Sequence, residues 1–344
     1  MAYSTISKPS LYFNTKLYTG NGGTQSITGV GHQPDWTWIK VTNESGDHGL
    51  WDAVRGVSKR IQSNENSAET TTSGVTAFGT DGFTMGSNSS YNGSGKPYVS
   101  WNWKAGTTGS GTTTGAGTGK AYSYSVNTTA GFSIIKYKGN GTNGHQIPHH
   151  LGTSPSMTII KITSGSDNWI VQSEIRGWDK RLILDTSNSE AAHTDFVTGV
   201  SSTTLTLQTN GSVNGNDADY IAYVFAEKTG YSKFGSYIGN GNANGSFIYT
   251  GFAPSWVMEK RTAGSGWNWY INDNVRKTFN VNSTSLFADN SNAETSDGMY
   301  IDMLSNGFKL RETGNATNAS GQPMFYMAFG QSIVGSNNIP ATAR

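Results

Sequence analysis

Short segments in which large apolar residues alternate with polar ones recur along the whole chain, and clusters of Gly, Asn and Ser separate them. A period of two places the apolar side chains of a segment on one face of a β-strand, and the clusters supply turn-forming residues. The best candidate for a short helical turn is 52–60. The pattern predicts an all-β protein built from antiparallel β-sandwiches of the jelly-roll type.

A series of motifs occurs three times in the same order. Each copy begins with a tyrosine that is followed after one position by Gly-Asn-Gly, and the Asn-Gly pair provides the positive φ angles of a tight turn. A strand that starts with Pro, carries two large apolar residues at alternate positions and ends in Lys follows each turn. The turns lie at 18–22, 137–141 and 237–241, and the strands at 34–40, 155–161 and 254–260.

The later part of each copy contains three further motifs. These are a strand around a tryptophan (Trp51, Trp169 and Trp269), a patch of Asn, Ser, Ala and Glu (67–69, 189–191 and 292–294), and a closing aromatic strand (98–103, 220–225 and 324–329). We expect the patches to be surface loops and the tryptophans at shared positions, which also include Trp36, Trp103 and Trp256, to lie in the core.

The repeats define the expected domain organisation. Three tandem β-sandwich domains are predicted at 11–104, 131–228 and 233–331. The segment 105–130 is rich in Gly and Thr and is expected to act as a flexible or extended linker. Because almost no spacer separates the second copy from the third, these two are expected to pack as the more rigid pair.

Composition excludes several classes of function. The chain has 24 Lys and Arg against 23 Asp and Glu, so its net charge of +1 provides no field that attracts nucleic acid. It contains no cysteine, which excludes disulfides and thiolate chemistry. No export signal and no apolar run of the ~20 residues that span a bilayer is found, so we expect a protein made in a host cytoplasm without insertion into a membrane.

Residue types that carry catalysis or bind metals are present but form no strong motif. The loop 145–150 holds His145, His149 and His150, and Asp217 and Asp219 occupy alternate positions as in calcium loops. A solvated histidine loop and an ordinary Asn/Asp turn are the favoured explanations of these residues, because neither group has the additional ligands at fixed spacing that a metal site requires. We therefore expect no metal, no cofactor and no enzymatic activity, although it stays open whether either group binds a metal.

Aromatic residues that lack a counterpart in the other copies are the candidates for contact with a ligand. Exposed Trp and Tyr rings stack on sugars and anchor protein interfaces. The candidates are Trp178, Trp267 and Tyr91.

The stretches 98–106 (YVSWNWKAG), 232–241 (SKFGSYIGNG) and 304–311 (LSNGFKLR) resemble structural proteins of tailed bacteriophages that infect aquatic bacteria. The resemblance extends from about Tyr12 to Phe329. It implies tandem lectin-like sandwich repeats and a virion component, either part of a tail fibre or a protein of the particle surface. It implies no set of catalytic residues.

The leading hypothesis is a non-enzymatic virion structural protein. Its expected partners are other virion proteins, further copies of itself and host cell-surface polysaccharide, for which repeated weak sites would provide avidity. One alternative is a carbohydrate-binding module or a polysaccharide depolymerase, in which loop carboxylates such as Asp47 and Asp52, beside Glu44, would hydrolyse a glycan. Another is a capsid decoration protein that binds no ligand.

Overall fold

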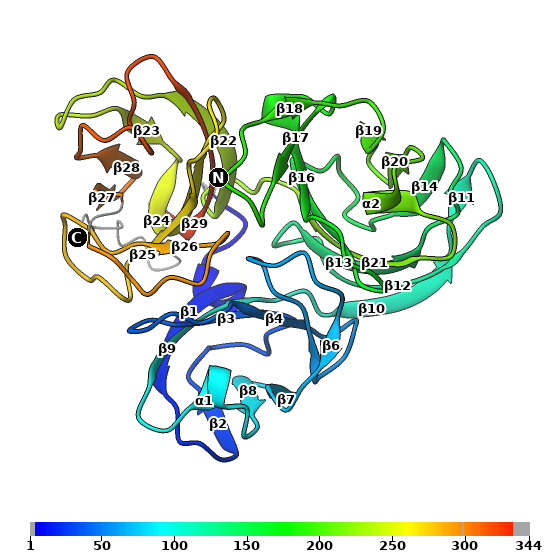
Figure 1. Cartoon of the computed structure of the whole chain (residues 1–344), viewed down its shortest axis with the longest axis horizontal. Helices are drawn as coiled ribbons and strands as arrows, with labels where there is room; N and C mark the ends of the chain where they lie inside the picture. Colours follow the sequence, from blue (N-terminus) through cyan, green and yellow to red (C-terminus); the bar gives the residue numbers. More distant parts are fainter. Residues whose placement is uncertain (1–3, 297–298, 333–344) are drawn as a thin grey trace.

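The computed structural model describes residues 4–296 and 299–332, and these residues are mostly β-strands and the turns between them (Figure 1). Within them, α-helix is limited to the four-residue helices α1 (Ser89–Asn92) and α2 (Gly211–Asn214). The prediction of an all-β protein is confirmed. The predicted helical turn at 52–60 is wrong, because Asp52 ends strand β4 and turns then lead into β5.

Repeats 1 and 3 are sandwiches of two antiparallel sheets. In each repeat we call the sheet with the Pro-led strand the first layer and the other sheet the second layer. The first layers have the strand orders β1-β9-β3-β4 and β22-β29-β24-β25-β26, and the second layers β2-β8-β7 and β23-β28-β27. In repeat 1 the strands are β1 (Phe13–Thr19), β2 (Gln25–Thr28), β3 (Trp36–Val41), β4 (Gly49–Asp52), β7 (Val75–Gly79), β8 (Gly82–Met85) and β9 (Pro97–Trp103), with a small ribbon of β5 (Lys59–Arg60) and β6 (Thr70–Thr71). In repeat 3 they are β22 (Ser232–Ile238), β23 (Phe247–Tyr249), β24 (Phe252–Arg261), β25 (Trp269–Asp273), β26 (Leu286–Phe287), β27 (Ile301–Leu304), β28 (Gly307–Leu310) and β29 (Pro323–Ser332).

Repeat 2 has the same two layers with additional strands. Its sheets have the orders β10-β12-β13-β21-β15-β16-β17-β18 and β11-β14-β20-β19. The segment 105–130 is therefore not a linker, since it forms β10, β11 and β12 and adds strands to the edges of both layers of repeat 2. The strands are β10 (Thr107–Thr112), β11 (Thr114–Gly115), β12 (Ala121–Asn127), β13 (Phe132–Lys138), β14 (His145–Pro148), β15 (Met157–Ile162), β16 (Ile170–Ser173), β17 (Lys180–Ile183), β18 (Ala191–Ala192), β19 (Val197–Val200), β20 (Thr204–Leu207) and β21 (Asp219–Phe225).

The first layers of all three repeats contribute to a central hydrophobic core. Trp36 of repeat 1 stacks on Tyr223 of repeat 2 with ring centroids 4.3 Å apart, and Phe13 of repeat 1 stacks on Phe329 of repeat 3 at 5.2 Å. A further core lies between the two layers of each repeat. The repeats thus surround a shared core (Figure 1), and the expectation of a loosely linked repeat 1 beside a rigid pair is wrong.

The strand register corrects one of the alignments between copies. Trp36, Met157 and Trp256 lie opposite Asp52, Ser173 and Asp273. Counting back along these strands makes His48, and not Trp51, the counterpart of Trp169 and Trp269. All the shared tryptophans are nevertheless buried, as expected for core residues.

These three counterpart rings connect the repeats in a closed cycle. The Nε1 of Trp169 donates to the carbonyl of Gln62 in repeat 1, and that of Trp269 donates to the carbonyl of Ile183 in repeat 2, both at 2.8 Å. The Nδ1 of His48 accepts from the indole of Trp38, so its Nε2 carries the proton and donates to the carbonyl of Phe287 in repeat 3 at 2.7 Å. Burial lowers the pKa of His48 to about 3, which keeps this ring neutral.

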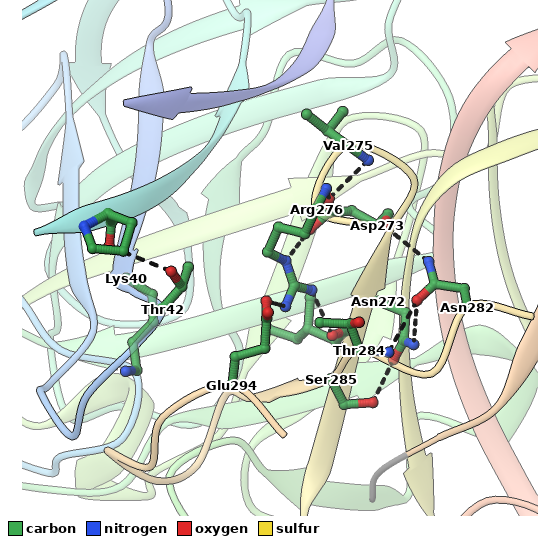
Figure 2. A network of polar contacts seen from close by, with 12 residues as sticks. Lys40, Thr42, Asn272, Asp273, Val275, Arg276, Asn282, Thr284, Ser285 and Glu294 are labelled. Atoms are coloured by element: carbon green, nitrogen blue, oxygen red, sulfur yellow. Dashed lines mark hydrogen bonds and ion pairs between the residues drawn. The ribbon is translucent and has the colours of Figure 1, made fainter. Parts of the chain in front are cut away.

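The Asn/Ser/Ala/Glu patches lie between repeats and are not simple surface loops. The backbone N–H groups of Glu69, Glu190 and Glu294 each donate to a carbonyl of a neighbouring repeat, at 3.0, 2.9 and 2.8 Å. The carboxylate of each glutamate also pairs with an arginine of its own repeat. Figure 2 shows the network of repeat 3, in which the guanidinium of Arg276 lies between Asp273 and Glu294.

A buried asparagine holds each Gly-Asn-Gly turn in place. The side-chain Oδ1 atoms of Asn92, Asn214 and Asn318 accept from the backbone N–H of Asn21, Asn140 and Asn240 at 3.0–3.1 Å. Their Nδ2 atoms donate to backbone carbonyls, and all three side chains are fully buried. The turns that identify the repeats in the sequence are therefore fixed to the interior of each sandwich.

Replacing Asn214 by Ala should destabilise the protein by about 3 kcal/mol, because buried donors and acceptors lose their partners. Among these are the N–H of Asn140, the Nδ1 of His145 and the carbonyl of Gln208. Urea unfolding measures the effect. Asn216→Ala, an exposed position in the same turn region, is the control and should change stability by less than about 0.5 kcal/mol. Equal stability of the two variants would contradict the role of Asn214.

Candidate binding groove

The loop carboxylates considered for glycan hydrolysis do not form an exposed pair. Asp52 is fully buried, and its carboxylate accepts from Arg55 Nε at 2.5 Å and from the hydroxyl of Tyr223 at 2.8 Å. Asp47 accepts from Asn64, and Glu44 pairs with Lys96 at 2.5 Å. Asp52 thus serves as an internal ion-pair partner and is not accessible to a polysaccharide.

The histidine loop and the Asp-rich turn make contacts within the protein. His145 is buried between Asn214 and Thr113, and the ring of His150 stacks on Tyr124 with centroids 3.7 Å apart. Asp217 and Asp219 pair with Lys120 and Lys138. Across residues 4–296 and 299–332, no three His, Asp or Glu side chains are grouped to hold a metal ion.

The three aromatic candidates lie in different repeats and are not brought together. Tyr91 is fully buried, packs edge-on against Trp51 with centroids 5.0 Å apart, and donates to the carbonyl of His48, so its expected place on the surface is wrong. Trp178 is half-buried against the core between the layers of repeat 2. Trp267 is half-buried, with the guanidinium of Arg261 4.8 Å from its ring centroid.

A groove of ≈ 650 Å³ lies along the open edge of repeat 3, where it faces repeat 2. Its walls are β22, β23 and the short 3-10 turn η2 (Glu174–Arg176) of repeat 2. Both strands are the outermost ones of their sheets, so the groove opens along the edges of both layers. Aromatic and aliphatic side chains line it, together with Glu174, Glu227 and Lys233: these apolar residues are Ile175, Phe234, Tyr237, Phe247, Ile248, Tyr249 and Tyr326.

A glycine determines the depth of this groove. Gly235 lies directly opposite Tyr326 in the register of β22 and β29, and a Cβ at position 235 would lie only 2.5 Å from the Tyr326 hydroxyl. The tyrosine ring can therefore lie across the strand. Phe308 packs edge-on against Tyr326 at 5.3 Å and holds the ring from the interior.

The charged groups at the groove are largely balanced. Lys233 pairs with Glu227 at 3.1 Å, and the other carboxylate oxygen of Glu227 accepts from the backbone N–H of Phe234 at 3.4 Å. Beneath the groove, burial raises the pKa of Glu259 to about 8, so its side chain is a neutral acid at pH 7. The groove is suited to a neutral, partly aromatic ligand.

Three exposed apolar residues at this edge have no large apolar counterpart at the same positions of the other repeats, although Leu17 on the edge strand β1 of repeat 1 is itself 42% exposed. Ile238, Phe247 and Tyr249 are 57%, 47% and 55% exposed. Strand register shows which residues of repeats 1 and 2 occupy the same positions. The counterparts of Ile238 are Thr19 and Lys138. The counterparts of Phe247 are Ser26 and Gln146, and the counterparts of Tyr249 are Thr28 and Pro148. Ile175 of repeat 2, 50% exposed, faces the same groove. The sequence signal for this site is the run of three large apolar residues at 247–249, where the other copies have Ser-Ile-Thr and Gln-Ile-Pro.

Comparison with protein families gives a match over residues 8–332 to a family described as a domain of unknown function, DUF7483. The chain belongs to this family. The match covers all three repeats. No curated protein and no solved structure matches the chain.

Between residues 4 and 332, apart from 297–298, no helix has the length and apolar character that crossing a bilayer requires.

Proposed function

We propose that this chain is a non-enzymatic structural protein of a bacteriophage particle, which attaches to another protein of that particle through the groove of repeat 3. The observation that carries the proposal is the set of exposed apolar side chains at this edge, Phe247 and Tyr249 in the groove and Ile238 on β22 beside it. Exposed apolar clusters of this kind mark sites of protein contact. The resemblance to tailed-phage structural proteins supports a virion as the setting.

The rest of the architecture is consistent with a structural role. The three repeats share a core and are connected by a closed cycle of hydrogen bonds, which gives a rigid body. A rigid body with a distinctive edge can hold a partner in a defined orientation. Self-association into a fibre or ring, and adhesion to host polysaccharide through Trp178 or Trp267, are further proposals that the groove does not require.

The test is chemical cross-linking of purified particles followed by mass spectrometry. Lys233 lines the groove, so we expect it to be cross-linked to a lysine of a different particle protein. Lys16, which lies on β1 of repeat 1 and outside the groove, should not be cross-linked to that protein. A chain with Phe247→Ser and Tyr249→Thr, which introduces the residues found in repeat 1, should fold normally by circular dichroism but fail to join the particle. Absence of the wild-type protein from purified particles would overturn the proposal.

A further inference from the structure

We propose that the partner enters the groove as an extended β-strand that pairs with the free edge of β22, in the way that β12 pairs with β13 within repeat 2. This inference rests on the proposed function and specifies the chemistry of the same site. The occupant is a segment of another protein with large apolar, preferably aromatic, side chains at alternate positions and small polar residues between them.

Repeat 2 provides the template for this mode of binding. The strand β13 is the counterpart of β22, and β12 pairs antiparallel with it, with Ser125 opposite Ile134 and Ser123 opposite Lys136. On the other face of β12, Tyr122, Tyr124 and Val126 pack against the core between the layers. The short strand β11 likewise covers the edge of β14, the counterpart of β23. The chain itself thus fills, in repeat 2, the edge that stays open in repeat 3.

The backbone of β22 is oriented to receive such a strand. The N–H of Phe234 points away from β29, since it donates to the carboxylate of Glu227, whereas the N–H of Gly239 donates to the carbonyl of Gln322 on the β29 side. Orientation alternates along a strand, so the N–H groups of Ser236 and Ile238 point outward. Ser236 is exposed, so its outward N–H is accessible to an incoming strand, whereas the outward carbonyl of Ile238 already accepts from Ser246 Oγ at 3.0 Å and marks the end of the available edge.

The side chains around this edge define what the incoming strand must carry. Gly235 replaces the Ile135 of repeat 2, which lies opposite Tyr124 of β12. An aromatic residue placed opposite Gly235 would contact Tyr326 and Ile248, and its neighbours two positions away would contact Phe247 and Ile175. Main-chain pairing provides affinity in strand addition, and alternate side chains provide specificity.

The probe is a fluorescein-labelled synthetic peptide with the sequence of residues 119–129 (GKAYSYSVNTT), which contains β12. Fluorescence anisotropy measures its binding to the whole chain, and amide NMR locates it. We expect saturable binding, with the largest shifts at Ser236 and Ile238. No binding at about 1 mM peptide would overturn the inference, because a strand that fits the groove should exceed that weak affinity.

Substitutions at the edge test the mode of binding. Ser236→Pro removes an outward N–H that the fold does not use, and Pro is tolerated at such edge positions. It should weaken peptide binding at least about tenfold, and so should Phe247→Ser, which leaves the backbone intact. The matched control is Leu17→Pro, at the corresponding position of the edge strand β1, and it should leave binding within about twofold. Unchanged binding by Ser236→Pro would overturn strand addition.

The outcomes separate this inference from the proposed function. Peptide binding at Ser236 together with absence of the protein from particles would refute the virion role and retain strand addition. Incorporation of Ser236→Pro into particles at the wild-type level would retain the virion role and refute strand addition. If the chain alone dimerises and Ser236→Pro makes it monomeric, a second copy occupies the edge and the proposed partner is wrong.

Discussion

Replacing Asp52 by Asn is expected to destabilise the protein by about 3–5 kcal/mol, the range for breaking a buried ion pair by removing one partner. The carboxylate of Asp52 accepts from the Nε of Arg55 and from the backbone N–H groups of Val54 and Arg55. It also accepts from the hydroxyl of Tyr223, which belongs to repeat 2. A neutral amide would leave the buried guanidinium without its nearest counter-charge and would turn an N–H₂ group toward other donors.

The same geometry recurs in repeat 3 and should respond in the same way. Asp273 accepts from Arg276 Nε at 2.6 Å and from the indole of Trp101 in repeat 1 at 3.1 Å. Repeat 2 has Ser173 at this position, and its arginine, Arg176, pairs with Glu190 and has no aspartate partner of this kind. Each aspartate therefore anchors an arginine to a neighbouring repeat, which makes Asp273→Asn a second, independent measurement of the effect.

Urea unfolding at pH 7 checks the prediction for Asp52. Glu44→Gln is the control, because Glu44 forms an exposed pair with Lys96 and surface pairs contribute about 0–1 kcal/mol. A reducing-sugar assay on the same variants tests the depolymerase hypothesis. Wild-type stability of Asp52→Asn, together with loss of sugar release that the wild type shows, would mean that the carboxylate acts in catalysis and not in the fold.

The all-β class and the threefold repetition could be predicted because both depend on local signals. The alternation in each Pro-led strand and the Asn-Gly turns are properties of a few consecutive residues, and the structure retains them. The common core was not predicted, although β3 and β15 carry a signal for it. Trp36 and Trp38 face one side of β3 while Ile39 and Val41 face the other, and a strand that is apolar on both faces is covered on both faces.

The error at 105–130 arose from composition. Gly and Thr are as frequent in the exposed edge strand β10 as in flexible linkers, so their abundance does not distinguish the two. The alternation of Tyr122, Tyr124 and Val126 with small polar residues predicts a strand at β12 and carries more information than the glycine content.

The candidate site could be predicted only in part. Tyr91 has no aromatic counterpart in the other copies, yet it is buried because Gly49 leaves space for its ring where repeats 2 and 3 have Ile170 and Tyr270. The absence of an aromatic counterpart thus does not establish exposure. Phe247 and Tyr249 could have been found by comparing aligned positions for a change from polar to apolar. The groove itself depends on the contact between repeat 3 and Ile175 of repeat 2, which the sequence does not reveal.

Replacing Glu259 by Gln should stabilise the protein at alkaline pH and remove a slope from its pH–stability curve. Glu259 is fully buried at a position occupied by Ile39 and Ile160 in the other repeats. Burial raises the pKa of its carboxyl from 4.5 to about 8. The hydroxyl of Tyr237 lies 2.7 Å from the carbonyl of Thr317 and 2.8 Å from the carboxyl. A hydroxyl has one proton, so both contacts are satisfied when Tyr237 donates to Thr317 and a protonated Glu259 donates to Tyr237.

The direction in which stability changes with pH follows from the number of protons that the folded and unfolded chains bind. Below pH 4.5 the folded and unfolded chains both hold the proton of Glu259, and its contribution to stability is fully present. Between pH 4.5 and about 8 the folded chain keeps a proton that the unfolded chain has released, so stability falls as the pH rises. At about 1.4 kcal/mol per pKa unit, the total loss is roughly 5 kcal/mol.

The interval from pH 6.5 to about 7.5 isolates this group. Asp185 and Asp289, whose pKa values burial raises to about 6, lower stability only up to that pH. His48, with its pKa lowered to about 3, costs stability only below its ordinary value of 6.5. Near and above pH 8, stability is raised by the loss of protons from three lysines whose pKa values burial lowers to about 8, Lys40, Lys161 and Lys260. Glu259 should therefore dominate between these limits.

Urea unfolding at several pH values in this interval provides the measurement. The wild type should lose roughly 1 kcal/mol between pH 6.5 and about 7.5, whereas Glu259→Gln should be flat and Glu65→Gln, at an exposed glutamate, should keep the wild-type slope. An unchanged slope in Glu259→Gln would show that Glu259 is ionised in the folded protein. Because Tyr237 connects this carboxyl to the groove of repeat 3, ionisation of Glu259 in the folded protein should also disturb the wall against which a partner strand packs, so peptide binding should weaken as the pH rises through about 8.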